Sequence, residues 1–171
     1  MDIVVVPDPG ARTRGLISFG SFRSACALGR SGISRLKTEG DGATPTGRFP
    51  LRRVLYRADR LSPPRTALPV AFIAGDDGWC DAPGDAAYNR PVKLPYPASA
   101  ETMFRVDSLY DLVVVLGHND DPVVPGAGSA IFMHVAAQDG TPTEGCIALD
   151  RDALLTLLEL IPRDVMLSVQ P

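Results

Sequence analysis

Short apolar runs bounded by Gly, Pro and Asp recur along the whole chain, and this spacing constrains the fold more than any other feature. Each run has the length and the β-branched or aromatic content of a strand and is too short for an ordinary helix. The 16 Gly and 16 Pro residues indicate many turns, which favours a mainly β fold over a helical bundle. The predicted strands are Ile3–Val6, Gly15–Phe19, Ala25–Leu28, Phe49–Tyr56, Pro69–Ala74, Asp111–Leu116, Ala130–His134 and Val165–Val169.

One helix is predicted near the C-terminus. Asp150 is a favourable N-cap, and Pro162 would stop the helix. The apolar residues between them recur at helical spacing on one face. They are Leu154, Leu155, Leu158 and Ile161. This helix should pack behind the strand that follows Cys146, and a second helix is predicted near Ala98–Phe104.

Length and composition indicate a single domain that covers residues 1–171. The hydrophobic content of 45% and charged content of 22% are ordinary for a globular protein. A net charge of −3 gives no broad positive field, so a nucleic-acid partner is not expected. No apolar run approaches the roughly 20 residues of a membrane span. The Pro-, Asp- and Gly-rich region Arg57–Leu94 is too long for a hairpin loop and should form a functional wall or lid.

A cysteine and a histidine form the strongest chemical signal in the sequence. Cys146 follows Gly145 and lies twelve positions after His134, one of only 2 histidines. An imidazole can take the thiol proton and later return it to a leaving amine, while glycine permits close approach of the backbone to a substrate. An isolated pair of this kind would more often be a buried cysteine and a core histidine. The surrounding residues favour catalysis.

These residues resemble the catalytic motif of the YkuD-type L,D-transpeptidases. The Ile131–His134 segment is similar to the family's Ile-x-x-His strand, and Thr143–Ile147 is similar to its Ser/Thr-His-Gly-Cys segment. Upstream, Thr44–Phe49 is similar to the family's Thr-Pro-x-Gly-x-Phe hairpin, so the resemblance covers roughly residues 29–169. It implies a β-sandwich of mixed sheets with one packed C-terminal helix. Catalysis would use Cys146 as nucleophile and His134 as base, with a backbone carbonyl near Val135 orienting the imidazole.

Three positions depart from the family pattern. Glu144 replaces the histidine that usually stands two residues before the cysteine, Ala148 replaces a common arginine, and Val135 replaces a glycine. Loss of the arginine removes a bidentate partner for a substrate carboxylate. Glu144 is expected to point away from Cys146, toward a backbone donor, an Arg or a Lys, because a facing carboxylate would raise the thiol pKa.

Further residues are candidates for the active-site loop and for substrate binding. The backbone N–H groups of Gly145 and Cys146 could form an oxyanion hole, and the Thr143 hydroxyl could bond the backbone or the tetrahedral intermediate. Some side chains could line a cleft, or else serve the core or a turn; these candidates are Trp79, Tyr88, Asn89, Arg90 and His118. We favour Arg90 as the partner of a substrate carboxylate, ahead of Lys93, Arg48 and Arg52. Lys37 could also meet a substrate carboxylate, although a solvated charge is the commoner role for such a residue.

The resemblance implies acyl transfer on peptidoglycan stem peptides, with release of D-alanine and an amine, including a protein lysine, as acceptor. Water as acceptor would make the protein an L,D-carboxypeptidase or amidase, and an inactive peptide-binding module is a third reading. No cofactor or metal is expected, although His118, His134 and Cys146 could in principle hold zinc. A Cys26–Cys80 bridge would leave Cys146 free. The family works in the periplasm or cell envelope, whereas the N-terminus lacks the pattern of a secretory signal, which keeps the cytoplasm open.

Overall fold

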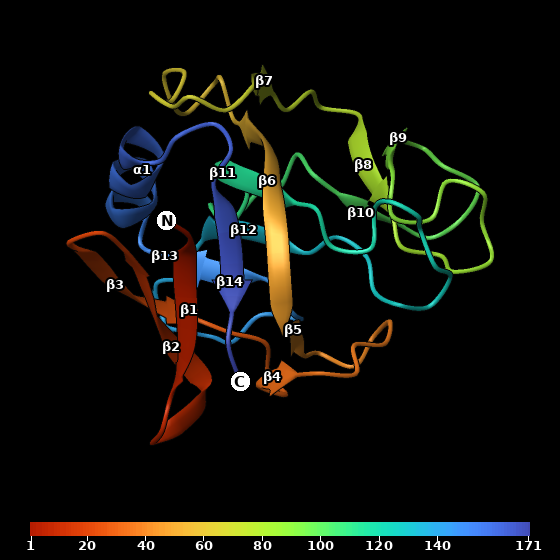
Figure 1. Cartoon of the computed structure of the whole chain (residues 1–171). Helices are drawn as coiled ribbons and strands as arrows, with labels where there is room; N and C mark the ends of the chain where they lie inside the picture. Colours follow the sequence, from red (N-terminus) through yellow and green to blue (C-terminus); the bar gives the residue numbers. More distant parts are fainter.

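A mixed sheet of nine strands dominates the computed structural model, which describes residues 1–171 (Figure 1). In sheet order the strands are β11 (Leu112–Leu116), β12 (Phe132–Val135), β13 (Ile147–Leu149), β3 (Phe22–Ala27), β2 (Ala11–Phe19), β1 (Ile3–Asp8), β14 (Met166–Val169), β6 (Gly47–Tyr56) and β7 (Val70–Phe72). A further pairing of β11 with β6 closes the first eight strands into a barrel.

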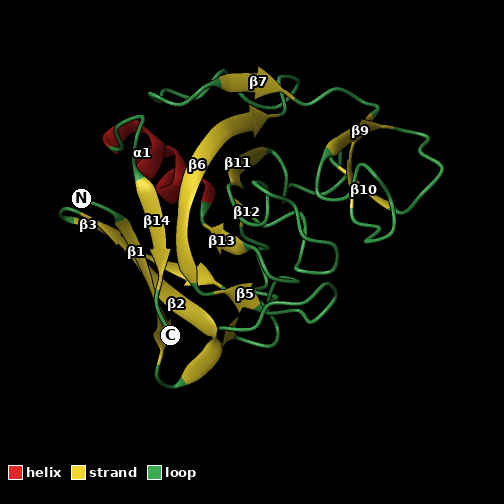
Figure 2. Cartoon of the chain, turned by 45° about the vertical axis from the view of Figure 1, so that its right-hand side comes forward, coloured by secondary structure: helices red, strands yellow, loops and turns green.

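The long strand β6 makes this closure possible. Its first half pairs with β14 and its second half with β11, while β7 adds to it as a parallel partner. Figure 2 shows how strongly β6 curves to meet both neighbours. The predicted mainly β architecture with a mixed sheet is therefore confirmed, and the sheet closes on itself instead of forming two separate layers.

All eight predicted strands are present, whereas the second predicted helix is wrong. Ala100–Thr102 forms strand β10, which pairs antiparallel with β8 (Asp77–Cys80). Backbone pairing to β8 outweighs the helix-forming Ala and Glu residues of this short segment. Strand β9 (Pro91–Lys93) completes a three-stranded sheet with β8, and β4 (Ile33–Ser34) pairs with β5 (Thr44–Pro45).

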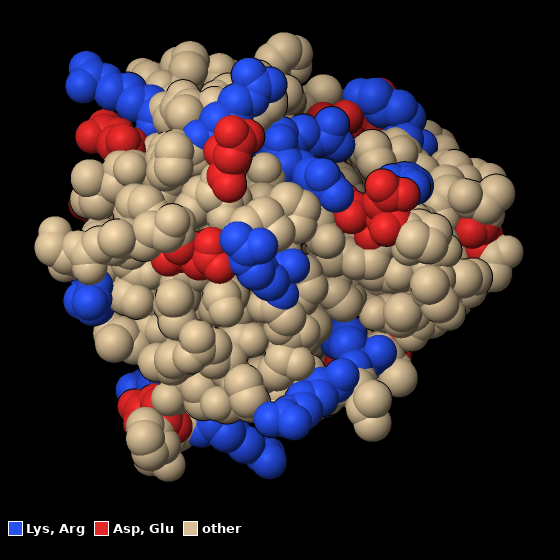
Figure 3. Space-filling model, in the orientation of Figure 1, with Lys and Arg blue, Asp and Glu red and all other residues tan.

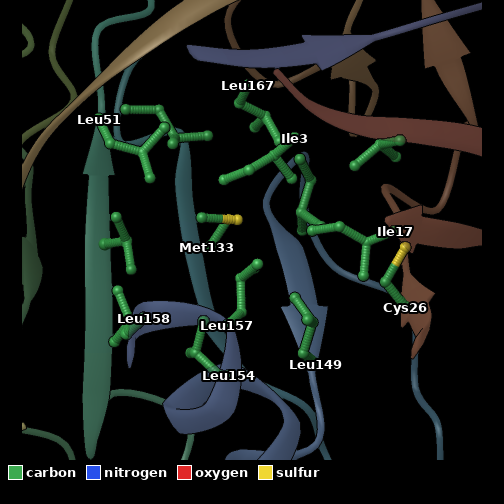
Figure 4. Packing of buried hydrophobic residues seen from close by; sticks show 14 of the residues in the cluster. Ile3, Ile17, Cys26, Leu51, Met133, Leu149, Leu154, Leu157, Leu158 and Leu167 are labelled. Carbon is green, nitrogen blue, oxygen red and sulfur yellow. The ribbon is translucent and has the colours of Figure 1, made fainter. Parts of the chain in front are cut away.

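The predicted C-terminal helix is confirmed as α1 (Arg151–Leu160). The Asp150 carboxylate accepts hydrogen bonds from the backbone N–H groups of Asp152 and Ala153, at 2.9 and 3.3 Å. Three leucines of α1 lie in the main core beside Met133 of β12, as Figure 4 shows. They are Leu154, Leu157 and Leu158. With ten residues, α1 is neither long nor apolar enough to cross a membrane.

Two hydrophobic cores lie on opposite faces of β11 and β12. Leu112, Val114 and Met133 point into the main core inside the barrel. Val113 and Phe132 belong to a second core that the three-stranded sheet covers, where Trp79 packs edge-on against Phe132 with ring centroids 5.1 Å apart. The continuous apolar run of β11 follows from burial on both faces. Cys146 belongs to the second core, on the outside of the barrel.

Candidate active site

Parallel pairing of β12 with β13 brings the cysteine and the histidine into one cavity. Met133 pairs with Ile147, so Cys146 lies beside Phe132, whose N–H donates to its sulfur at 3.4 Å. Because side chains alternate along a strand, His134 points to the same side as Phe132. Cys146 and His134 both line a cavity of about 470 Å³.

The Cys146 thiol is protonated at neutral pH in this conformation. Its Sγ donates to the backbone carbonyl of Ala130 at 3.2 Å, and the residue is 8% exposed. Burial raises the pKa of the Cys146 thiol to about 12, and the negative charge of Glu101 adds to this effect. No hydrogen bond joins the thiol to His134, so proton transfer requires the sulfur to turn away from Ala130.

The His134 imidazole is held in the form that a general base requires. Its Nδ1 lies 2.8 Å from the carbonyl oxygen of Val135, which accepts the Nδ1 proton and leaves Nε2 as an acceptor. Burial lowers the pKa of His134 to about 4, so the ring is neutral. Tyr110 packs edge-on against the ring, with centroids 5.3 Å apart. The orienting backbone carbonyl predicted from the sequence is present.

The turn before Cys146 is fixed by the Thr143 hydroxyl. Thr143 Oγ1 donates to the carbonyl of Cys146 at 2.6 Å and accepts from the N–H of Gly145 at 3.1 Å. Gly145 has a φ of 138°, in the region that favours glycine, and a Cβ there would lie 2.8 Å from the carbonyl oxygen of Ala43. Since the Gly145 N–H already has a partner, the Cys146 N–H is the better oxyanion donor, because it makes no hydrogen bond within the protein.

The Thr44-Pro45 motif meets the cysteine motif at this turn. Thr44 is fully buried, and its Oγ1 accepts from the N–H of Gly29 at 2.9 Å. The same hydroxyl lies 3.5 Å from the carbonyl oxygen of Cys146, to which it donates. Two threonine hydroxyls, from segments a hundred residues apart, therefore hold one carbonyl. The sequence pattern identified the motif that contains Thr44, but it did not predict Thr44 as a site residue.

Lys37 lines the cavity, so of the two roles considered for it the solvated charge is wrong. Its side chain is only 7% exposed and forms an ion pair with Asp41. The Asp41 carboxylate also accepts from the backbone N–H groups of Thr38 and Ala43, at 2.8 Å each. Lys37 Nζ lies 3.5 Å from the position that a Cβ on Gly145 would take. A buried cation thus stands beside the nucleophile's turn.

Four carboxylates line the same cavity: Glu144 of the cysteine motif, and Glu39, Asp81 and Glu101, which were not predicted from the sequence. Burial raises the pKa of Glu101, and its Oε1 accepts from the hydroxyl of Tyr110 at 2.5 Å. Asp81 Oδ1 is buried without a hydrogen-bond partner. Glu39 Oε2 accepts from the hydroxyls of Tyr88 and Ser129, at 2.5 and 2.7 Å.

Glu144 has the partner expected for a side chain turned away from the thiol. Its carboxylate is 77% exposed and pairs with Arg30 at 2.8 Å. Ala148 lines the cavity beside His134, its register partner on β12, so the position of the family's arginine faces the site without offering a cation. The carboxylate whose charge opposes the Cys146 thiolate is Glu101, from a distant strand.

Trp79, Tyr88 and Asn89 build the wall behind the site and do not line the cavity. The Asn89 side chain is buried and accepts from Trp79 Nε1 at 3.0 Å and from the N–H of Ala130 at 3.1 Å. It also donates to the carbonyl of Asn119 at 2.8 Å. Asn89 therefore positions Ala130, whose carbonyl accepts the hydrogen bond of the Cys146 thiol, and connects the long middle region to the site.

Arg90 and His118 also lie away from the Cys146 cavity. Arg90 lines a second cavity of about 400 Å³ and donates to the carbonyl of Asp120 at 3.0 Å. His118 Nε2 lies 3.0 Å from the carbonyl oxygen of Ala127, within the loop that this histidine opens. Of the two histidines, the structure brings His134 to Cys146. The cations of the main cavity are Lys37 and Arg105, and Arg105 was not predicted.

All three cysteines are free thiols, so the Cys26–Cys80 bridge is absent. No group of three or more His, Cys, Asp or Glu side chains is arranged to hold a metal ion, and this argues against the zinc alternative. The arrangement suits nucleophilic chemistry by one thiol and one neutral imidazole.

Comparison with known proteins agrees with this chemistry. The family model described as the L,D-transpeptidase catalytic domain, YkuD, matches residues 5–167. No curated protein and no solved structure matches the chain.

Proposed function

Because this chain belongs to the YkuD family of L,D-transpeptidase catalytic domains, we propose that it transfers the acyl group of a peptidoglycan stem peptide through a thioester on Cys146. One observation carries the proposal: the thiol and a neutral imidazole of fixed tautomer line the same cavity. The acyl donor is a stem peptide that ends in D-alanine after a diamino acid. The proposed place of action is the cell envelope, where such peptides occur.

The first half of the reaction forms the thioester. The Cys146 sulfur attacks the carbonyl carbon between the diamino acid's L-centre and D-alanine, while its proton moves to His134 Nε2. Since burial disfavours a free thiolate and a free imidazolium alike, proton transfer and attack occur together. The carbon–nitrogen bond then breaks, and the imidazolium protonates the departing amino group of D-alanine.

The oxyanion formed during attack has two partners beside Cys146. The Cys146 N–H is unbonded in the resting structure, and the ammonium group of Lys37 lies next to Gly145. An N–H and a nearby cation both stabilise negative charge that develops on the carbonyl oxygen. Arg105 is the candidate partner for the terminal carboxylate, because its Nε and Nη2 bond Asp107 while Nη1 stays free.

The second half releases the acyl group to an amine. An amine from a second stem peptide or a protein lysine attacks the thioester carbonyl and passes a proton to His134. The new amide forms and the thiol is restored. Water in place of the amine gives the carboxypeptidase reaction.

The direct test is D-alanine release from a stem tetrapeptide, measured with and without an added amine. We expect release that depends on Cys146 and a new amide product when the amine is present. Cys146→Ala and His134→Gln should abolish release while keeping the fold. Release without any amide product would indicate hydrolysis, and no release by folded wild-type protein would contradict the proposal.

Covalent labelling provides a second test that needs no acceptor. A carbapenem carries a strained lactam carbonyl that a thiol can open, so we expect one adduct per chain, on Cys146. Cys80 is fully buried and Cys26 lies in the main core, so neither should react. Intact mass and peptide mapping will locate the adduct, and modification of Cys80 instead would overturn the assignment of Cys146.

A further inference from the structure

The two cations of the main cavity already have carboxylate partners. Lys37 is paired with Asp41, which lies in the same loop. Arg105 donates to both oxygens of Asp107, at 2.9 and 2.6 Å. Neither cation forms an ion pair with a carboxylate of the cavity wall.

The carboxylates of Asp81 and Glu101 form no ion pair, although the charge of Arg105 acts on Glu101 across the cavity. Glu101 accepts one hydrogen bond from the Tyr110 hydroxyl and forms no ion pair. Asp81 Oδ1 is buried and accepts no hydrogen bond at all. Both side chains are partly buried, and neither carboxylate has an ion-pair partner. Removing a carboxylate from water without such a partner is costly, so two of them in one cavity favour a cationic ligand.

The three-stranded sheet directs the carboxylates of Asp81 and Glu101 toward the Cys146 cavity. Glu101 pairs with Trp79 across β10 and β8, and Asp81 follows Trp79 by two residues, so the three side chains share one face. On that face Trp79 packs against Phe132, whose N–H bonds the Cys146 sulfur. Asp81, Glu101 and Cys146 all line the same cavity.

We propose that Asp81 and Glu101 form a binding site for a primary ammonium group next to the Cys146 thiol. The inference rests on the proposed acyl transfer and names its substrate class: a peptide or amine that brings a positive charge to this wall. The charge comes either from the side-chain amine of the donor's diamino acid or from the acceptor amine. A bound ammonium would also offset the Glu101 charge that opposes thiolate formation.

Binding to the Cys146→Ala protein tests the donor as the source of the ammonium group. Calorimetry compares a stem tetrapeptide that has a free side-chain amine with the same peptide N-acetylated at that amine. The free amine should bind roughly tenfold tighter or more, the scale of one charge-assisted hydrogen bond. Adding Asp81→Asn or Glu101→Gln should bring the two affinities within about twofold of each other.

Asp76→Asn is the matched control for these substitutions. Asp76 directly precedes β8 but is exposed and paired with Lys93, so its loss should leave the preference for the free amine unchanged. Asp81→Asn removes a charge whose Oδ1 holds no hydrogen bond, and should therefore keep the fold even if Glu101→Gln does not. Circular dichroism and melting temperature check each variant.

The acceptor is tested with active protein and the N-acetylated donor. If the ammonium comes from the acceptor, Asp81→Asn should raise the KM for the amine about tenfold, while acetylation of the donor leaves its binding unchanged. The proposal is overturned if neither donor binding nor acceptor KM responds to the substitutions. If the wild-type protein releases no D-alanine but still prefers the peptide with the free amine, the proposed acyl transfer is refuted and the ammonium site is supported.

Discussion

Two glutamates near Cys146 differ in their effect on its thiol. Glu144 lies two positions before Cys146 in the sequence but is exposed and paired with Arg30. Glu101 is distant in sequence, yet its charge faces the sulfur and raises the thiol pKa. Proximity in sequence therefore misidentifies the carboxylate that matters for reactivity.

Glu101→Gln should speed alkylation of Cys146 by iodoacetamide at pH 7–8, because removing the charge lowers the thiol pKa. A tenfold faster rate would correspond to about 1.4 kcal/mol. Glu144→Gln should stay within about threefold of wild type. The rates are measured by intact mass, with Cys146→Ala as the unreactive control. If only Glu144→Gln accelerates alkylation, the carboxylate that raises the thiol pKa is Glu144 and not Glu101.

His134 should make the fold less stable in mild acid. Its folded pKa of about 4 lies below the ordinary 6.5, so the unfolded chain takes up a proton that the folded protein excludes. Above pH 6.5 both states are neutral and the effect vanishes. Between pH 6.5 and 4 the free energy of unfolding should therefore fall as the pH falls.

Replacing His134 removes this contribution. Urea unfolding of His134→Gln should show a loss of stability from pH 7 to pH 4.5 that is smaller than the wild-type loss by about 2–3 kcal/mol. The pH dependence of His118→Gln is measured for comparison. Burial also lowers the pKa of His118, but this residue lies outside the cavity. Equal pH dependence in wild type and His134→Gln would show that His134 titrates normally.

At the scale of elements, β5 is joined to the cysteine turn by one hydroxyl. Thr44→Val keeps the shape of the side chain but leaves the buried Gly29 N–H without its acceptor. We expect a loss of about 1–3 kcal/mol in the free energy of unfolding. D-alanine release should fall as well, because the Cys146 carbonyl loses a donor. Thr44→Ser retains the hydroxyl and should stay close to wild type in both assays.

Sequence patterns predicted the elements whose signals are local. The eight apolar runs and the capped helix α1 are present because their composition and their caps determine them. The predicted helix at Ala98–Phe104 failed because β10 forms only through pairing with β8, which no local pattern encodes. Closure of the sheet into a barrel likewise depends on long-range pairing of β6 with β11.

The reactive pair was predictable, whereas its surroundings were not. Cys146 and His134 stand out by their spacing and motif, and the structure brings them to one cavity. Glu101, Asp81 and Arg105 reach that cavity from the three-stranded sheet and the segment after it. These three residues lie far from the cysteine motif in the sequence, and no sequence pattern links them to it. In sequence Lys37 resembles an ordinary surface charge, and only its burial beside Gly145 distinguishes it.

On the scale of the whole molecule, recognition must come from the cavities. The face shown in Figure 3 carries acidic and basic side chains interspersed, and the net charge is only −3. Such a surface provides little long-range attraction for a charged substrate. Two cavities flank Ile131, one with Cys146 and Arg105 and the other with Arg90. Only the first of these gives a substrate access to the thiol.

Each cavity contains one arginine that could bind the substrate carboxylate: Arg105 in the first and Arg90 in the second. Arg105→Gln should lower kcat/KM for the tetrapeptide. The expected loss of transition-state stabilisation is about 2–3 kcal/mol, the scale of losing a charged hydrogen-bond partner. Arg90→Gln should stay within about threefold of wild type, because Arg90 lies in the other cavity and bonds the Asp120 carbonyl. Alkylation of Cys146 by a small neutral reagent should change little in either variant, which separates recognition from nucleophile reactivity. Should Arg90→Gln carry the loss while Arg105→Gln does not, the peptide must extend over Ile131 into the second cavity, and the acyl donor would bind in a longer groove than the Cys146 cavity alone.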